Sequence, residues 1–271
     1  MTWTTVLTPL SGVDDDARSL LAADALACPF NARVVAAYVS ADAAELMPWM
    51  GEGFMGGVQV AALESVRTAA EEGRRIAESR FDDANCAHKT FIALESPIAA
   101  SLCTEARYAD VAVFGPDAAR GRGALVEAFQ RVLMEERRPV LVAREPPSRD
   151  WTVAIAWDGG REAAGAVRRA LPWLKIASKV VVLAAVKATP RQFDPQRMID
   201  HLASHGVNAE LDTIRQGHEP APLILSAVKA AGAKMLIAGA FGHPRFQQFI
   251  FGGATRTLMQ SEDGPSLFLS H

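Results

Sequence analysis

Four glycines in the stretch GAFGHPRFQQFIFGGAT have a spacing that suits phosphate binding. Gly239 and Gly242 follow a short apolar run, and Gly252 and Gly253 precede an expected helix at 254–260. Glycine lets the backbone turn with positive φ and approach a ligand closely, while the first N–H groups of a helix attract anions. The stretch is therefore a candidate phosphate cradle. The same spacing also fits a strand-to-loop turn and a helix break, because isolated glycine patterns give many false matches.

Two other residues of this stretch carry groups that attract anions. His243 and Arg245 lie between the second and third glycines, and an arginine can hold a phosphate through two parallel hydrogen bonds. A plain surface loop explains the two residues equally well, so both interpretations stay open.

Two polar patterns elsewhere have simpler explanations than metal binding. His201 and His205 would share one face of a helix, and His218 follows after the next strand. Two such histidines can bind zinc, but no third ligand stands at a recognisable spacing, which favours an exposed helical face. The run Asp14–Asp16 is interpreted as capping of a helix N-terminus, where carboxylates interact favourably with the helix dipole.

The sequence offers no catalytic group with a partner. Ser101 and the three cysteines, Cys28, Cys86 and Cys103, lack both a nucleophile elbow and a partnered histidine. We therefore expect a protein that is not an enzyme, in which any hydrolysis is slow and incidental. The odd cysteine count, without CxxC spacing, also argues against a disulfide framework and favours a reducing compartment.

The composition argues against nucleic-acid-binding and membrane-spanning proteins. The chain has 271 residues, enough for two domains, with 49% hydrophobic and 22% charged residues and a net charge of −3. Lys and Arg are spread along the chain, so a nucleic-acid partner is not expected. No apolar run is long enough for a membrane span and no signal peptide is recognisable, so we expect a cytoplasmic protein without membrane contact.

An internal repeat organises the chain, because each half opens and closes with similar segments. The corresponding segments are Thr4–Pro9 and Thr152–Trp157 (first strand), Asp14–Ala27 and Glu162–Leu174 (first helix), Arg33–Val39 and Lys179–Val186 (second strand), Ala109–Gly115 and Ala233–Gly239 (fourth strand), and Arg138–Ala143 and Gly264–Leu269 (last strand). The second copy is shorter. The part it lacks corresponds to the loop Met47–Val58 and to part of the expected helix Ala61–Arg80.

Strand and helix patterns alternate within each copy, which predicts βαβ units and a parallel sheet. The fold class is therefore α/β: two tandem, doubly wound, Rossmann-like domains, each a five-stranded parallel sheet flanked by four helices. Arg144–Asp150 contains two prolines and mixed charge, as is typical of a linker. We predict a first domain at 1–145 and a second at 151–271.

These features together resemble the universal stress protein family. The spacing G-x2-G-x9-G, at Gly239, Gly242 and Gly252, is similar to the family's nucleotide loop on the fourth strand and fourth helix. The resemblance includes the segment 156–159 (AWDG) after the first strand and the last strand Pro265–Leu269. It covers the whole chain as a tandem pair and implies an adenine nucleotide alpha hydrolase-like fold.

The resemblance implies roles for residues of the second copy. Asp158 would contact the nucleotide near adenine and ribose, and the loop glycines would hold the phosphates. The family has Ser or Thr where this sequence has Gly253, so we expect weakened binding, with Thr255 as a substitute hydroxyl one turn later. The candidate site comprises Ala156, Trp157, Asp158, Gly239, Gly242, His243, Arg245, Gly252, Gly253, Ala254 and Thr255.

The first copy departs further from the family pattern. Ser11 stands where the second copy has Asp158, and Gly121 and Gly123 are displaced from the loop spacing. We expect this copy to be a structural partner without a nucleotide site.

The function implied is that of a universal stress protein, a regulatory or protective module of the stress response that binds ATP or a related adenine nucleotide, with no metal motif. The alternative is a nucleotide-independent protein-interaction scaffold in which the loop Met47–Val58 binds a partner. An adenylating enzyme would need a phosphate-clamping motif beyond His243 and Arg245, and none is present.

The last strand of each copy predicts how the two copies associate. Domains of this family pair through them, so Pro139–Ala143 and Pro265–Leu269 are expected to pair within the chain as an intramolecular pseudo-dimer that covers both edges. The sequence leaves open whether a homodimer also forms, and it identifies no protein partner.

Overall fold

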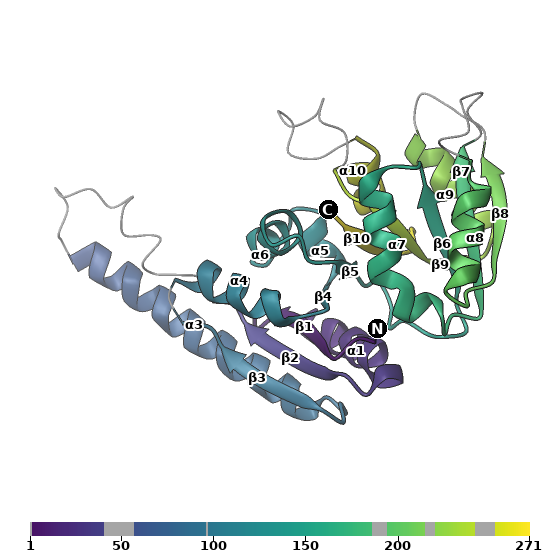
Figure 1. The fold of residues 1–271 in the computed structure, drawn as a ribbon. Coiled ribbons are helices and arrows are strands. Elements are labelled where there is room, and N and C mark those ends of the chain that lie inside the picture. The colour runs from purple at the N-terminus through teal and green to yellow at the C-terminus, as the bar shows by residue number, and fades with distance from the viewer. Residues whose placement is uncertain (1, 41–56, 96, 186–193, 215–219, 242–252) are drawn as a thin grey trace.

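The computed structural model describes residues 2–40, 57–95, 97–185, 194–214, 220–241 and 253–271. In this part of the chain, ten strands form one sheet in the order β3-β2-β1-β4-β5-β10-β9-β6-β7-β8. The first five strands make one half of the sheet and the last five make the other (Figure 1). The expected tandem α/β fold is therefore confirmed.

The central strands are buried on both faces, as expected for a sheet covered by helices on two sides. The strand bounds are Thr5–Leu10 (β1), Arg33–Tyr38 (β2), Lys89–Ala93 (β3), Val111–Phe114 (β4), Val140–Val142 (β5), Thr152–Trp157 (β6), Lys179–Ala185 (β7), Ala209–Ile214 (β8), Ala233–Gly239 (β9) and Ser266–Ser270 (β10). Strands β3 and β8 form the two outer edges.

The junction between the halves is an antiparallel strand pair. Neighbouring strands run parallel within each half, whereas β5 and β10 run antiparallel, with Val142 opposite Leu267 and Val140 opposite Leu269. This pairing confirms the prediction that the last strands of the two copies cover each other's edge.

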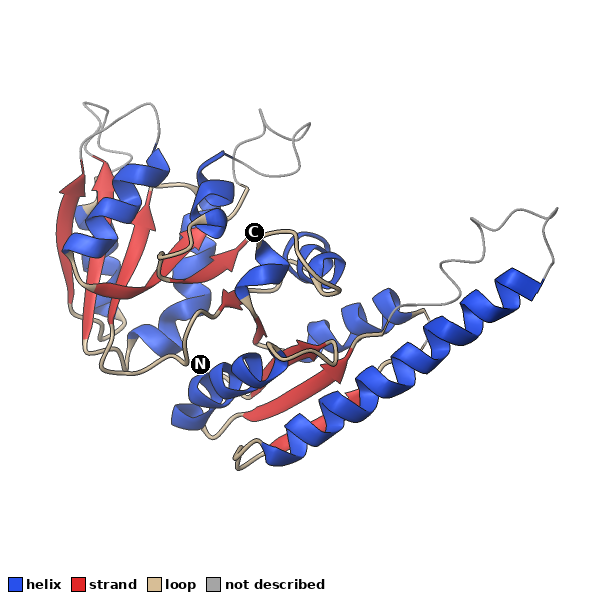
Figure 2. Cartoon of the chain, turned by 180° about the vertical axis from the view of Figure 1, so that it is seen from behind, coloured by secondary structure: helices blue, strands red, loops and turns tan. Residues whose placement is uncertain are grey.

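Helices cover both faces of the sheet (Figure 2). Their bounds are Asp16–Ala27 (α1), Cys28–Phe30 (η1), Gly57–Asp83 (α3), Ile98–Tyr108 (α4), Pro116–Ala119 (α5), Val126–Gln130 (α6), Arg131–Glu135 (η3, a π-helical turn), Arg161–Leu174 (α7), Gln196–Ser204 (α8), Pro220–Ala230 (α9) and Gly253–Gln260 (α10). None of the helices in the described ranges combines the length and the hydrophobicity that a bilayer crossing requires.

Each face of the sheet has a hydrophobic core that runs through both halves. One core packs α1, α7 and α8 on the sheet, and the other packs α4, α5, α6, α9 and α10 on the opposite face. Trp3 joins the halves in the first core, because its ring stacks on Trp173 and Phe268 at centroid distances of 6.5 and 6.0 Å. The boundary between 145 and 151 remains a prediction from the sequence.

The two halves differ most in the helix after their second strand. In the first half this is α3, with 27 residues, and in the second half it is α8, with 9 residues. Figures 1 and 2 show α3 running well beyond the strands it covers. This difference in helix length partly explains why the second copy is shorter than the first. Residues 47–56 of the expected Met47–Val58 loop lie outside the described residues, and α3 begins at Gly57.

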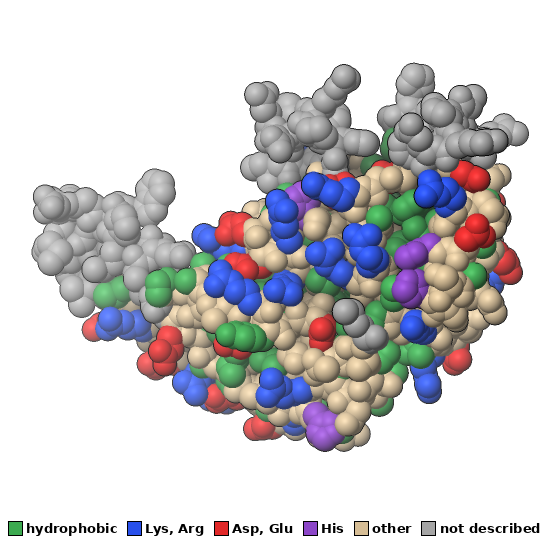
Figure 3. Space-filling view, viewed as in Figure 1, with side chains coloured by type: hydrophobic (Ala, Val, Ile, Leu, Met, Phe, Trp, Pro, Cys, Tyr) green, Lys and Arg blue, Asp and Glu red, His purple; other side chains and the backbone are tan. Residues whose placement is uncertain are grey.

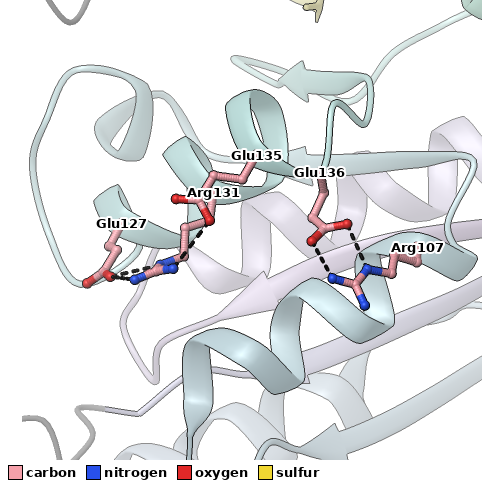
Figure 4. Close-up of polar contacts among 5 residues, drawn as sticks. All are labelled: Arg107, Glu127, Arg131, Glu135 and Glu136. Atoms are coloured by element: carbon pink, nitrogen blue, oxygen red, sulfur yellow. Dashed lines mark hydrogen bonds and ion pairs between the residues drawn. The ribbon is translucent and has the colours of Figure 1, made fainter.

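A polar network joins α4 to the segment after β4 (Figure 4). Arg107 donates to Glu136 through Nε and Nη2, both at 2.8 Å, which links α4 to the end of η3. Arg131 contacts Glu127 at 2.8 Å and Glu135 at 3.3 Å. In element order, α6 and η3 precede the last strand of the first half as α10 precedes that of the second half.

Candidate functional site

The strand order of the second half reverses between β6 and β9, since β7 and β8 lie on one side and β10 on the other. Ligands of doubly wound sheets bind beyond the carboxyl ends of the strands at such a reversal. The register that pairs Ile155 with Ile237 brings the ends of the two strands, Trp157 and Gly239, together. We call the region beyond these two strand ends the switch point.

Asp158 occupies a tight turn at this switch point. Its Oδ1 accepts a hydrogen bond from the backbone nitrogen of Gly160 at 2.7 Å, and Gly159 has a φ of 78°. The turn leads directly into α7 at Arg161. The Asp158 side chain is exposed, so one carboxylate oxygen is held by the turn while the group faces solvent, where a ligand hydroxyl or amine can reach it.

Gly239 lies against the start of α7. A Cβ built at this position would be 2.5 Å from the Ala163 nitrogen and 2.9 Å from the Cβ of Glu162. No other residue type fits there without a backbone shift. Close packing of β9 on α7 therefore explains why this residue is a glycine. Its contact with a phosphate stays a prediction.

The start of α10 lies on the same side of the sheet as α9 and begins at Gly253. A Cβ built at Gly253 would meet nothing within 4 Å. Ala254 packs on the core, and Thr255 is buried, so its hydroxyl belongs to the protein interior. Because the first N–H groups of a helix have no intrahelical partner, this end of α10 offers donors to an anion.

The remaining predicted residues divide into two groups. Ala156 packs on the core that contains α9 and α10, whereas Trp157 packs on the core that contains α7 and α8. Ala156 and Trp157 thus flank the end of β6 on opposite faces. Four predicted site residues lie outside the described ranges: Gly242, His243, Arg245 and Gly252.

Three residues at the switch point were not predicted from the sequence: Glu162, Phe241 and His271. Glu162 stands in the first turn of α7, close to Gly239. His271 donates from Nδ1 to the carbonyl oxygen of Ala240 at 2.9 Å, and its ring lies 6.3 Å from that of Phe241. Glu162 could have been found as an acidic residue in the helix turn that follows the Asp-Gly-Gly sequence, but no local pattern marks His271.

Phe241 has a backbone conformation that is rare for its type, with a φ of 63°. Left-handed conformations of bulky residues cost about 1–3 kcal/mol and cluster at functional sites. Phe241 is the second residue after β9 and the last described residue before 253. The strained backbone of Phe241 lies between Gly239 and Gly242, the first two glycines of the candidate phosphate-binding stretch.

The described part of the switch point is mainly acidic. Burial opposes ionisation of Glu162, but the hydrogen bond from its own backbone N–H and the neighbouring Arg161 guanidinium outweigh this effect and hold the pKa of the carboxyl below its usual value. Glu162 is therefore anionic near neutral pH, and Arg161 is highly exposed. Figure 3 shows Lys and Arg side chains lying over and beside α7 on the face that this helix covers.

The corresponding region of the first half, between β1 and β4, is occupied by the chain itself. The Asp16 carboxylate is 2% exposed and accepts hydrogen bonds from the backbone nitrogens of Ser11 (3.1 Å), Gly12 (2.6 Å) and Val13 (3.2 Å). Burial raises the pKa of Asp16, although these hydrogen bonds act in the opposite direction. The N–H groups that follow β1 are thus already paired with an internal anion.

The aspartate run does not cap α1 as expected. Asp15 is the residue before the helix but makes no side-chain capping bond. Its carboxylate instead lies against Gly115 at the end of β4, and Asp14 pairs with Arg80 of α3. The physical reason is tertiary: Asp16 turns back to the loop before the helix, where three N–H groups converge on it. Gly121 and Gly123 have φ values of 80° and 81° and serve as turn residues.

The histidine pair lies on α8 and at its end, and His218 is outside the described ranges. The rings of His201 and His205 meet edge to face at a centroid distance of 4.7 Å. Burial, His205 and the nearby Arg168 lower the pKa of His201. The two rings thus contact each other at the end of α8, and the cationic form of His201 is disfavoured.

Solved structures share this fold over nearly the whole chain. A universal stress protein from Archaeoglobus fulgidus matches with a TM-score of 0.67 and 14% identity, covering 99% of this chain and 96% of that one. A putative universal stress protein from Pseudomonas aeruginosa matches with a TM-score of 0.59 and 11% identity, covering 99% and 93%. A functionally unknown protein from the same species matches with a TM-score of 0.57 and 10% identity, covering 99% and 92%.

These matches establish the fold: the chain has the tandem α/β architecture of universal stress proteins. No protein-family model matches the sequence, and no curated protein matches it. A shared fold does not by itself define a function, which has to be argued from the residues at the switch point.

Proposed function

We propose that this chain is a cytoplasmic universal stress protein of the tandem type, with domains at 1–145 and 151–271, whose second domain binds ATP or a related adenine nucleotide at the switch point. The observation that carries the proposal is the Asp158 turn, which presents an exposed carboxylate at the end of β6, beside the end of β9. Universal stress protein structures with the same tandem fold support the assignment.

Charge indicates how the nucleotide would be oriented. The carboxylates of Asp158 and Glu162 would repel phosphate from the α7 side of the switch point. The start of α10 offers backbone N–H groups instead, beginning at Gly253. We therefore place the ribose near Asp158, which can accept hydrogen bonds from hydroxyl groups, and the phosphates toward α10.

The proposed activity is binding without turnover. Regulation by a bound nucleotide requires saturable, reversible binding, and neither Asp158 nor Glu162 has a nucleophile as partner among the contacts of the described residues. The stress response is the process that the family resemblance implies, and a change in nucleotide level is the signal such a module would sense.

Calorimetric titration of nucleotide-stripped protein with ATP and with AMP tests the proposal. We expect one saturable site per chain, and a loss of about tenfold or more in affinity in Asp158→Ala, because a charge-assisted hydrogen bond and the turn are both removed. Asp158→Asn keeps an oxygen for the Gly160 nitrogen and isolates the contribution of the charge. Asp212→Ala, an exposed aspartate on β8, is the matched control.

Two results would overturn the proposal. One is the absence of binding at millimolar nucleotide, which would leave a protein-interaction scaffold with a structural glycine loop. The other is binding that Asp158→Ala and Asp212→Ala weaken equally, which would place the nucleotide elsewhere.

A further inference from the structure

Arg144 of the first half holds the far end of α10. Its guanidinium donates to three carbonyl oxygens: Pro265 at 2.9 Å, Glu262 at 2.7 Å and Leu258 at 3.5 Å. Its backbone nitrogen also donates to the Ser266 hydroxyl at 3.1 Å. One side chain that follows β5 thus satisfies carbonyl groups at and beyond the last turn of α10.

Arg120 makes a second contact from the same half. Its Nη2 donates to the carbonyl oxygen of Ser261 at 3.1 Å, and Gln260 of α10 donates back to the Arg120 carbonyl at 3.2 Å. Arg120 directly follows α5, the segment that comes after β4. In the repeat, this segment corresponds to the glycine loop of the second half. The segment after β4 in the first copy therefore contacts α10, which is the helix that follows the glycine-rich stretch 239–253 in the second copy.

These contacts matter because α10 is short. It has eight residues, and helices of that length are not stable on their own, so tertiary contacts fix their position. Positive groups at a helix C-terminus also interact favourably with the helix dipole. The helix spans about 12 Å at 1.5 Å per residue, so a displacement at Gln260 is transmitted to Gly253.

We propose that Arg120 and Arg144 are positioning residues for the nucleotide site: the first half, which binds no nucleotide itself, holds α10 so that its first N–H groups face the switch point. The proposal rests on the function proposed above. It gives the first copy a role in the second copy's site, although Arg120 and Arg144 contact the end of α10 opposite Gly253.

The test compares the double variant Arg120→Met/Arg144→Met with Arg122→Met, an exposed arginine in the same segment as Arg120. Methionine keeps much of the side-chain volume and removes the donors. We expect ATP affinity to fall about three- to tenfold in the double variant, the range of coupling between contacting elements, and to stay unchanged in Arg122→Met. Hydrogen exchange of the α10 amides should accelerate only in the double variant.

Each result decides the question. Weaker binding with faster α10 exchange and unchanged exchange in β6 and α7 supports positioning, because a merely structural role would move exchange throughout the second half. Unchanged affinity and exchange overturn it. If the wild type binds no nucleotide, the proposed function fails, and the exchange comparison alone decides whether the arginines hold α10. If the double variant does not fold, Arg120→Met alone is compared by the same two measurements.

Discussion

Gly239 and Ala163 approach so closely that a Cβ added to Gly239 would lie 2.5 Å from the Ala163 nitrogen. A Gly239→Ala substitution therefore forces β9 and α7 apart at their contact. We expect the free energy of unfolding to fall by about 1–3 kcal/mol, as for other overpacked sites. Urea denaturation measures this, with Gly253→Ala as control because a Cβ there meets nothing within 4 Å. Equal effects of the two substitutions would contradict the packing argument.

Gly253→Ser should strengthen nucleotide binding. The family pattern places a hydroxyl at this position, and the structure has room for the added atoms. One hydroxyl contact to phosphate contributes about 0.5–1.5 kcal/mol, which corresponds to a decrease of about three- to tenfold in the ATP dissociation constant. Titration of Gly253→Ser beside Gly253→Ala separates the hydroxyl from the added carbon. If Gly253→Ser and Gly253→Ala bind ATP with equal affinity, the serine hydroxyl does not contact the phosphates and the prediction is wrong.

Asp16→Ala should destabilise the first half without affecting nucleotide affinity. The substitution leaves the nitrogens of Ser11, Gly12 and Val13 without their acceptor. Hydrogen bonds to a charged group contribute about 1.5–3 kcal/mol, which is the expected loss in the free energy of unfolding. The control is Asp14→Ala, which removes a fully exposed carboxylate from the same turn. The interpretation of an internal anion is wrong if Asp16→Ala unfolds no more easily than Asp14→Ala.

The contact between Arg107 and Glu136 predicts a pH dependence. The hydrogen bonds from Arg107 hold the pKa of Glu136 below its ordinary value of 4.5. As the pH falls, the unfolded chain therefore takes up this proton before the folded chain does, and the stabilisation is lost below pH 4.5. Arg107→Gln should accordingly be less stable than the wild type near neutral pH.

The measurement is thermal unfolding of wild type and Arg107→Gln near neutral pH and at about pH 3, where the difference should be smaller. Arg74→Gln, which removes an exposed pair on α3, serves as the comparison. A difference between wild type and Arg107→Gln that persists unchanged at acid pH would rule out Glu136 as its source.

Apolar runs bounded by Gly and Pro predicted most of the sheet. The strands Thr152–Trp157 and Ala233–Gly239 have the bounds that the sequence indicated, because buried parallel strands are continuous apolar segments whose ends are marked by turn residues. The pairing of β5 with β10 was also predictable, since two exposed edges in one chain are best covered by each other.

Side-chain contacts between distant segments were not predictable. The composition of Arg144–Asp150 indicates a linker, and nothing local shows that the Arg144 guanidinium reaches carbonyl groups more than a hundred residues away. The same holds for Asp16, which looks like a capping residue until the loop before α1 is seen to fold over it. For the candidate site, the positions of Asp158 and Gly239 at neighbouring strand ends follow from topology, while their contacts with a nucleotide stay predictions.

The antiparallel junction has a consequence for the order of events during synthesis. Strand β5 pairs with β4 on one side, and its other edge is covered only by β10. Arg144 and Ser266, which bond across this junction, are 122 residues apart. While the ribosome makes the second half, the first half carries an open strand edge that can pair with the wrong neighbour. Nascent chains halted before β10 should therefore depend more on chaperones than chains in which β10 has emerged and covers the β5 edge.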